Sequence, residues 1–357
     1  MRLIHCADLH LDSKMETNLS HRQARERGSE ICAAFARMVD WAGENGVRGI
    51  LLAGDLFDTQ RVQKKTADFV LDTMAQAEGL EFFYLRGNHD DGRDPFAGRV
   101  LPENLHCFGK VWSGYRLEDV TITGLELDRE NWQTCWEALK LEPADTNIVM
   151  LHGQVATQPG EELIPLPLLR GRHIDYLALG HIHSFRRETL DDRGQWCYSG
   201  CLEGRGFDEC GPRGFVVLDI EKGRVRPAFI PFAIRQVREI PVDISRCVTI
   251  RQIHRAMEDA AAGVGEESMV RFLLTGTYTP ETQKDLATLT ELMAPRFWFV
   301  KVRDESRFRL DPASYEHDIS LKGQFIRLVM ASDRDPEEKA RIICAGLQAL
   351  AGEEEEV

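Results

Sequence analysis

Eight polar side chains directly follow short apolar segments of the sequence, and their chemical types suit metal binding. They are Asp8, His10, Asp55, Asn88, His89, His152, His181 and His183. A single histidine in such a position is more often a hydrogen-bonding residue than a ligand. Five of the chain's eleven histidines belong to this set, however, and so many independent coincidences are improbable. The pattern therefore indicates a metal site.

The mixture of carboxylate, imidazole and amide groups favours manganese, iron or zinc, whereas magnesium and calcium prefer oxygen ligands alone. Eight such groups exceed what one ion needs. Two ions about 3.5–4 Å apart, sharing a carboxylate, are the usual arrangement for attack at phosphorus, because together they stabilise the entering and leaving oxygens. Phosphoester hydrolysis is the favoured chemistry.

The apolar segments before these residues predict a sheet that brings the side chains together. Five strands are expected, over residues 2–7, 50–53, 81–86, 147–151 and 176–179. Predicted helices over residues 20–43 and 62–77 separate the first three strands, and this alternation is typical of an α/β fold. Reactive groups in such sheets gather beyond the carboxyl ends of the strands. Asp55 alone could equally be a helix cap or a turn residue, so its neighbours decide its role.

The alternation of strands and helices ends after these strands. Residues 187–230 read as antiparallel hairpins with turns at 192–194 and 221–223. We place a domain boundary after residue 232, followed by a smaller α/β domain over residues 233–350 and an acidic tail over 351–357. Within the second domain we expect strands at 237–242, 269–275 and 297–302. Four helices are expected there: one that ends at Gly263, one opened by Thr279 and Pro280, and two over 321–331 and 336–350.

Composition limits the other possibilities. No apolar run approaches the roughly 18 residues of a membrane span, and no signal peptide precedes the first strand, so we expect a cytoplasmic protein with no membrane contact. The nine cysteines are scattered without a paired motif, which favours reduced thiols; Cys197, Cys201 and Cys210 are spaced too irregularly for a strong metal motif. A net charge of −14 argues against a protein that coats nucleic acid, although a metal centre or a local basic strip can still attract it.

The motifs resemble those of a known superfamily. Asp8-x-His10, Gly54-Asp55, Gly87-Asn88-His89-Asp90, His152-Gly153 and Gly180-His181-x-His183 are similar to the full set of calcineurin-like metallophosphoesterase motifs, over roughly residues 1–232. Residues 5–11, 54–58 and 198–200 further resemble the SbcD-type DNA repair exonucleases. The resemblance implies a four-layer αββα sandwich followed by a small α/β capping and partner-binding domain.

The same resemblance implies roles for individual residues. Asp8, His10, Asp55 and His183 would hold one ion, most simply Mn²⁺. Asp55, Asn88, His152 and His181 would hold the second, so that Asp55 is shared. His89 would stabilise the transition state or protonate the leaving 3′ oxygen, and Asp90 would orient His89. A structural hydrogen bond is the alternative role of His89.

The resemblance also implies a function and partners. The expected activity is manganese-dependent cleavage of DNA in a repair complex with an SMC-like ATPase of the SbcC type, and a homodimer is compatible with this role. The last two predicted helices would dock the ATPase or pack on the second domain. The proline often found after the Asp55 motif is missing at residues 59–62, and long basic insertions are absent. A phosphodiesterase or phosphatase for small nucleotides is the first alternative, and a non-catalytic scaffold for an ATPase is the second.

Overall fold

The computed structural model of the chain describes residues 1–357 except 16–18, 59–61, 90–93, 280–281, 311–314 and 354–357. Its contacts divide the chain into two compact units, Met1–Gln236 and Val237–Val357. The sequence placed the division four residues earlier, after Phe232. Each unit has its own core, and each is described separately below.

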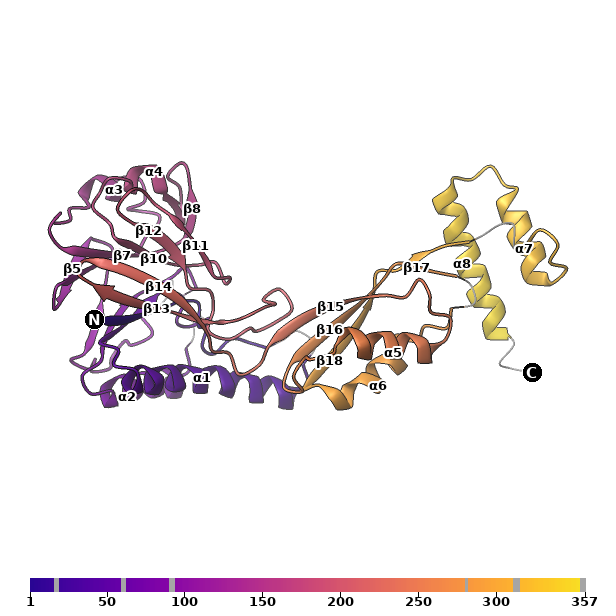
Figure 1. Cartoon of the computed structure of the whole chain (residues 1–357), viewed down its shortest axis with the longest axis horizontal. Helices are drawn as coiled ribbons and strands as arrows, with labels where there is room; N and C mark the ends of the chain where they lie inside the picture. Colours follow the sequence, from indigo (N-terminus) through magenta and orange to yellow (C-terminus); the bar gives the residue numbers. More distant parts are fainter. Residues whose placement is uncertain (16–18, 59–61, 90–93, 280–281, 311–314, 354–357) are drawn as a thin grey trace. The chain divides into compact units, whose positions relative to one another are not determined.

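The first sheet of unit 1 carries the amino-terminal strands (Figure 1). Its six strands lie in the order β14-β13-β1-β2-β3-β4. Strands β1 to β4 run parallel to one another, whereas β13 is antiparallel to β1 and to β14. The strand bounds are Arg2–Cys6 for β1, Gly49–Ala53 for β2, Glu81–Leu85 for β3, Leu105–Cys107 for β4, Gly214–Glu221 for β13 and Arg224–Pro231 for β14. The antiparallel β13–β14 hairpin and its turn confirm the hairpin that the sequence predicts around residues 221–223.

The second sheet of unit 1 lies in the order β11-β12-β10-β7-β6-β5. Its central strands β12, β10, β7 and β6 are parallel, and the two edge strands are antiparallel to their neighbours. The bounds are Ser113–Leu117 for β5, Val120–Gly124 for β6, Thr146–His152 for β7, Tyr176–Gly180 for β10, Arg186–Thr189 for β11 and Gln195–Tyr198 for β12. A small parallel pair, β8 (Gln154–Ala156) and β9 (Leu163–Pro165), lies outside this sheet.

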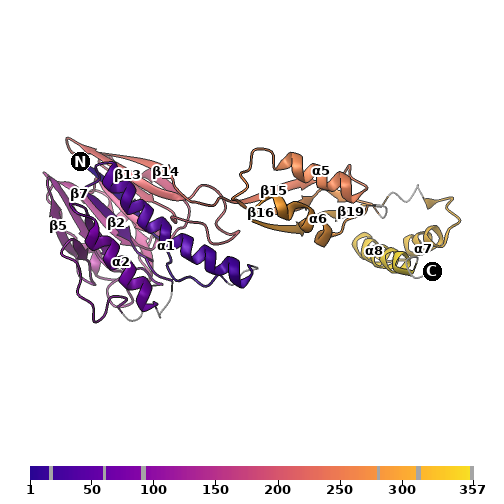
Figure 2. The same cartoon turned by 90° about the horizontal axis from the view of Figure 1, so that it is seen from below.

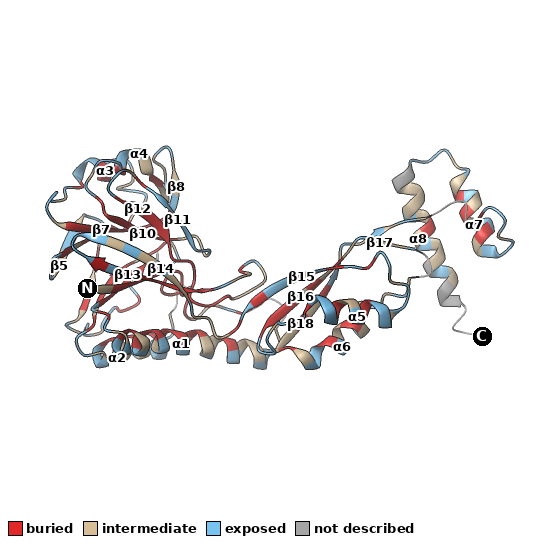
Figure 3. Ribbon diagram, viewed as in Figure 1, coloured by how far each residue is buried: buried red, intermediate tan, exposed pale blue. Residues whose placement is uncertain are grey.

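Three apolar clusters join these sheets into four layers. One packs helices α1 (His21–Glu44) and α2 (Lys64–Gln76) on the outer face of the first sheet (Figure 2). A second fills the space between the two sheets, whose strands are largely buried in Figure 3. The third packs the short helices α3 (Cys135–Ala138) and α4 (Leu166–Leu169) on the other face of the second sheet. The predicted αββα sandwich is confirmed.

Helix α1 forms where its sequence predicts. Ser20 and Gln23 make the reciprocal capping box, and Ile31, Phe35 and Met38 are buried on one face. Helix α3 has only four residues. Turns precede it, because the Asp128 side chain accepts hydrogen bonds from the backbone N–H groups of residues 130 and 131 and so competes with helix formation.

Unit 2 is built on a parallel three-stranded sheet in the order β15-β16-β18. These strands are Val237–Asp243, Met269–Thr275 and Phe299–Asp304, and helices α5 (Ile250–Ala260) and α6 (Leu286–Met293) share their core. The prediction that Thr279 and Pro280 open the second helix is wrong: α6 begins at Leu286, with Asp285 as its N-cap, and residue 280 lies outside the described ranges.

The remainder of unit 2 contains a short strand pair and two helices. Strands β17 (Thr277–Tyr278) and β19 (Arg307–Phe308) are parallel, and α7 (Leu321–Met330) and α8 (Pro336–Glu353) pack on each other through a separate apolar cluster that includes Ile326 and Ile343. Among the described residues of the whole chain, no helix combines the length and apolarity that crossing a membrane requires.

Candidate metal centre

Neighbouring parallel strands of both sheets end at the same place, and their ends carry the candidate residues. In the first sheet, Asp8 and His10 follow β1, Asp55 follows β2, and Asn88 and His89 follow β3. In the second sheet, His152 is the last residue of β7, and His181 and His183 follow β10. Because β2 also packs against β7 and β10 across the sandwich, the two sets of side chains meet.

Four of these residues have an unusual backbone conformation. Asp8, His10, Asp55 and His181 have positive φ angles of 54°, 47°, 50° and 103°. Non-glycine residues seldom occupy this region, and such strain is typical of functional sites. Asp8 and His10 point to one place because of these turns, with the His10 N–H donating to the Asp55 carbonyl at 2.9 Å. Strand alternation plays no part in this alignment, since β1 ends at Cys6.

Two glycines allow the strand ends to approach this closely. A Cβ atom at Gly54, where φ is +95°, would lie 2.1 Å from Nδ1 of His152. A Cβ atom at Gly87 would lie 2.2 Å from Oδ1 of Asp55. Both distances are far below van der Waals contact, so any larger residue would displace the site.

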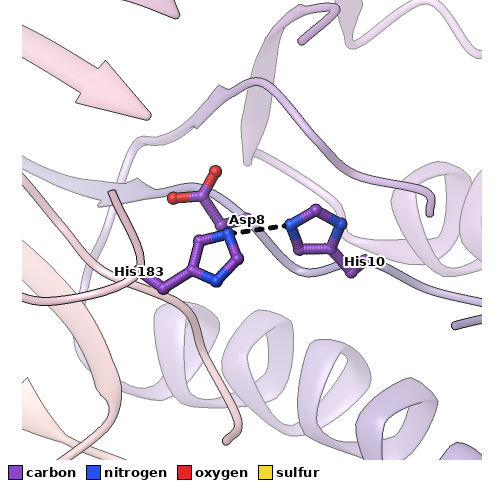
Figure 4. A group of neighbouring side chains, drawn as sticks. All are labelled: Asp8, His10 and His183. Atoms are coloured by element: carbon purple, nitrogen blue, oxygen red, sulfur yellow. Dashed lines mark hydrogen bonds between the residues drawn. The ribbon is translucent and has the colours of Figure 1, made fainter. Parts of the chain in front are cut away.

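His10 and His183 face each other in the first cluster, beside Asp8 (Figure 4). Nδ1 of His10 lies 3.0 Å from the Asp58 carboxylate, and Nδ1 of His183 lies 2.6 Å from the Glu209 carboxylate. Since an ionised carboxylate only accepts hydrogen bonds, both rings carry a proton on Nδ1. The two Nε2 atoms are 3.1 Å apart, so they turn their lone pairs toward each other when both rings are neutral, and a proton on either one makes the hydrogen bond drawn in Figure 4.

A cation between these nitrogens would satisfy both. With metal–nitrogen distances of about 2.0–2.1 Å, two imidazole ligands of one ion lie about 3 Å apart. One carboxylate oxygen of Asp8 is within ligand-sharing distance of both rings, and Oδ2 of Asp55 lies 3.7 Å from Nε2 of His10. The Asp58 and Glu209 contacts are the outer hydrogen bonds that orient metal-binding histidines. The residues present fit a divalent ion.

A second cluster lies on the other side of Asp55. Nδ1 of His152 donates to the Ala53 carbonyl at 3.0 Å, which leaves Nε2 facing Oδ1 of Asn88 at 2.9 Å and Oδ2 of Asp55 at 3.3 Å. Nδ1 of His181 lies 3.4 Å from the same Asn88 oxygen. Asp8, Asp55 and His152 also form a group whose ligand atoms lie close together. Asp55 is thus shared by both clusters, as a residue bridging two ions must be.

The buried carboxylates of the site favour a positive charge at its centre. Burial lowers the pKa of His152, but the carboxylates of Asp55 and Asp8 outweigh burial and raise it to about 9. Burial raises the pKa of Asp55, yet His152 and His10 hold it well below its usual range. A proton on His152 therefore occupies the electrostatic role of a metal ion, and metal binding would release it.

His89 lies at the open edge of the site. Its backbone N–H donates to Oδ1 of Asp55 at 2.9 Å, and its ring Nδ1 lies 3.1 Å from Asp58. The hydrogen bond to Asp58 raises the pKa of His89. With its side chain 48% exposed, His89 can reach a substrate. Asp90, predicted to orient His89, lies outside the described residues, and Asp58 makes the contact that orients the ring.

Three residues of this site received no metal-related role from the sequence. Asp58 stands in the motif over residues 54–58, so its position was visible but its two histidine partners were not. Glu209 follows His183 by 26 residues, and no local pattern connects them. Arg205 pairs with Glu209 and Asp58.

Three further arginines that follow His183 in the sequence have hydrogen-bond partners of their own. Arg213 is buried and donates to the His183 carbonyl, whereas Arg186 and Arg187 are exposed, with hydrogen bonds to Glu188 and to the carbonyl of Pro227. Cys197 and Cys201 are buried as free thiols, and the described side chains that could hold a metal ion include no cysteine.

The calcineurin-like phosphoesterase pattern matches residues 1–185, the part of the chain that supplies every candidate ligand. The chain belongs to this family. Metallophosphoesterases of this family normally bind two divalent metal ions, and they hydrolyse phosphoesters. In this phosphoesterase, the two clusters that share Asp55 are candidate ligand groups for such ions.

Relatives of this phosphoesterase extend over much of its length. It is 26% identical over 302 residues to the uncharacterised metallophosphoesterase YhaO of Bacillus subtilis, covering 78% of this chain and 72% of that protein. It is 26% identical over 258 residues to the DNA double-strand break repair protein Mre11 of Methanopyrus kandleri, covering 62% of this chain and 55% of that one. A dimetal phosphatase from Danio rerio is 13% identical with a TM-score of 0.41, over 65% of this chain and 99% of that chain.

Proposed function

We propose that this phosphoesterase is a Mn²⁺-dependent DNA nuclease that works in a repair complex with an SMC-like ATPase. The observation that carries the proposal is the pair of ligand clusters sharing Asp55, with the exposed His89 beside them. Similarity to proteins named for DNA double-strand break repair supports DNA as the substrate. The two ions would polarise the phosphate and supply an activated water.

The chain's own residues would position the ions and move one proton. His10 and His183 are fixed by Asp58 and Glu209, so their Nε2 atoms are aimed before an ion arrives. The raised pKa of His89 keeps more of its ring protonated near neutral pH. While Nδ1–H donates to Asp58, Nε2–H remains available to protonate the departing 3′ oxygen.

A small-nucleotide phosphodiesterase is the second candidate, and a cavity beside the second cluster favours it. This cavity of about 260 Å³ touches Asn88 and His152. Its charged lining has more carboxylates than cations: Glu126, Asp128, Glu161 and Glu162 against Arg86, Lys110 and Arg129. The lining and the net charge of −14 disfavour an extended polyanion more than a single small phosphoester, which carries fewer negative charges.

Cleavage assays on three substrates separate these candidates. Purified protein is incubated with linear duplex DNA, single-stranded DNA and bis-nitrophenyl phosphate, each with Mn²⁺ or a chelator, with and without a candidate ATPase. The nuclease proposal expects Mn²⁺-dependent DNA cleavage that Asp55→Asn abolishes and Asp145→Asn, outside the site, retains. Hydrolysis of the small ester but never of DNA would overturn it in favour of the second candidate, and inactivity on all three would favour a scaffold.

The role of His89 is tested in the same assay. His89→Gln should lower kcat by about 10²-fold or more, because the leaving oxygen loses its proton donor. Mn²⁺ binding should remain, since the backbone N–H of residue 89 still reaches Asp55. A substrate with a nitrophenolate leaving group, which needs no proton, should be affected much less. Equal losses on both substrates would contradict proton donation.

A further inference from the structure

Arg205 contacts both carboxylates that orient the histidines of the first cluster. Its Nη2 and Nε atoms lie 2.8 and 3.2 Å from Oε1 of Glu209, and its Nη1 atom lies 3.5 Å from Oδ1 of Asp58. That Glu209 oxygen is the one bound to His183, and that Asp58 oxygen is the one bound to His10. One guanidinium group is therefore linked to both facing imidazoles through one carboxylate each, and its Nη2 atom also lies 3.4 Å from Nδ1 of His183.

The segment that carries Arg205 is held firmly in place. The backbone N–H of Arg205 donates to the other Glu209 oxygen at 2.6 Å, so this glutamate is bound at both oxygens by one residue. Just before it, Glu203 and the Gly204 carbonyl each accept a 2.7 Å hydrogen bond from the buried Arg27 of α1. With its own side chain 18% exposed, Arg205 has little freedom to move.

Charge makes a cation necessary at this place. Asp58 and Glu209 bind the outer nitrogens of His10 and His183, while Asp8 and Asp55 lie near the inner nitrogens. Four carboxylates therefore surround this pair of rings. A carboxylate left without a positive partner would turn toward solvent or toward the ion itself, and the histidine it orients would lose its fixed ring position. A guanidinium offers several donors in a rigid plane, which suits contact with two carboxylates better than an ammonium does.

We propose that Arg205 is the positioning residue of the first metal position: it holds Glu209 and Asp58 and thereby aims Nε2 of His183 and of His10 without touching the ion. The proposal rests on the proposed metal-dependent function, but it concerns metal affinity rather than substrate. It assigns Arg205 to one of the two positions only, because His152 is oriented by the Ala53 carbonyl instead.

The test is Mn²⁺ binding to the full-length protein carrying Arg205→Gln, Arg205→Lys or the control Arg193→Gln. Arg193 forms a comparable two-point ion pair with Asp175 on the second sheet, outside the metal centre. Anomalous scattering from crystals equilibrated at graded Mn²⁺ concentrations reports the occupancy of each position, and spin-resonance titration counts tightly bound ions in solution. Neither readout depends on substrate cleavage.

Arg205→Gln should raise the Mn²⁺ concentration for half-occupancy of the His10–His183 position by about 10- to 100-fold, the usual effect of losing an outer hydrogen-bonding partner. The Asn88–His152 position should keep its affinity, and Arg205→Lys should lie between wild type and Arg205→Gln. Arg193→Gln should leave both positions unchanged. If Arg205→Gln does not fold, Glu209→Gln supplies the same test, because it removes the charge on the shared partner.

Two results would overturn the proposal for Arg205. In one, both positions fill in the folded Arg205→Gln variant as they do in wild type. In the other, both positions weaken equally, which would mark a general structural role. A wild-type protein that binds no Mn²⁺ would instead contradict the proposed function together with this inference, so the two failures are distinguishable.

Discussion

The Nε2 atoms of His10 and His183 face each other at 3.1 Å, and hydrogen bonds to Asp58 and Glu209 place the ring protons on the far side of both rings. When both rings are neutral, two lone pairs at this distance repel, and nearby Asp8 and Asp55 add negative charge. The protein therefore keeps an unfavourable arrangement that an ion makes favourable. Binding free energy, rather than folding alone, stabilises this region.

Removing the metal ion should change how the loss of His183 affects the melting temperature. In Mn²⁺-loaded protein, His183→Ala should lower the melting temperature, because a ligand is lost. In chelator-treated protein it should change the melting temperature little or raise it, since repulsion between the nitrogens is relieved. Differential scanning calorimetry of both forms tests this. An equal loss with and without metal would show that His183 stabilises the fold independently of an ion.

Asp55 should affect two metal positions and Asn88 only one. Oδ2 of Asp55 lies 3.3 Å from Nε2 of His152 and 3.7 Å from Nε2 of His10, so it reaches both clusters. Among the described residues of the site, Asn88 makes its hydrogen-bond contacts with His152 and His181. We expect Asp55→Asn to impair both positions and Asn88→Ala to empty mainly one, as measured by metal analysis after gel filtration. One position still full in Asp55→Asn at ordinary Mn²⁺ concentration would count against the shared ligand.

Gly87 tests how closely the strand ends must approach. A Cβ atom there would lie 2.2 Å from Oδ1 of Asp55 and 2.6 Å from its backbone nitrogen, so Gly87→Ala should displace Asp55 and weaken Mn²⁺ binding at least about tenfold. Gly43→Ala is the matched control: it lies inside α1 with no atom within 4 Å of a new Cβ. The control should stabilise the protein by about 0.5–1 kcal/mol. Unchanged metal affinity in Gly87→Ala would mean that the β2 and β3 ends can separate without loss.

The sequence predicted the ligands because each follows an apolar strand, and strand ends in a parallel sheet must meet. It could not predict what lies behind the ligands. Glu209 lies in the turns that follow β12 and contacts His183, 26 residues earlier in the chain. The residues just before Arg205, Glu203 and Gly204, are held by Arg27 of α1, which is 176 residues from Glu203. Positive φ at Asp8 and His10 was equally hidden, because no local sequence pattern indicates it. Local sequence patterns were enough to predict the strands. The hydrogen bonds around the metal centre depend on packing between distant parts of the chain.

His5 should make the stability of the metal-free protein depend on pH. It lies fully buried between the two sheets, where Nδ1 hydrogen-bonds to the Tyr176 hydroxyl at 2.9 Å. Burial lowers the pKa of His5 to about 3, whereas in the unfolded chain the pKa is near 6.5. Because the unfolded chain binds the proton more readily, the stabilisation is fully present above pH 6.5 and is lost as the pH falls toward 3.

The corresponding measurement is chemical denaturation of chelator-treated protein at pH 7.5 and pH 5. Each pH unit below 6.5 should cost about 1.4 kcal/mol through His5, so its contribution to the loss between the two conditions is about 2 kcal/mol. His5→Gln cannot titrate and should show a correspondingly smaller loss, although it is less stable than wild type at pH 7.5 because it packs less well between the sheets. The same pH dependence in both proteins would mean that His5 is already protonated in the folded state, with Tyr176 and a buried water taking up its charge.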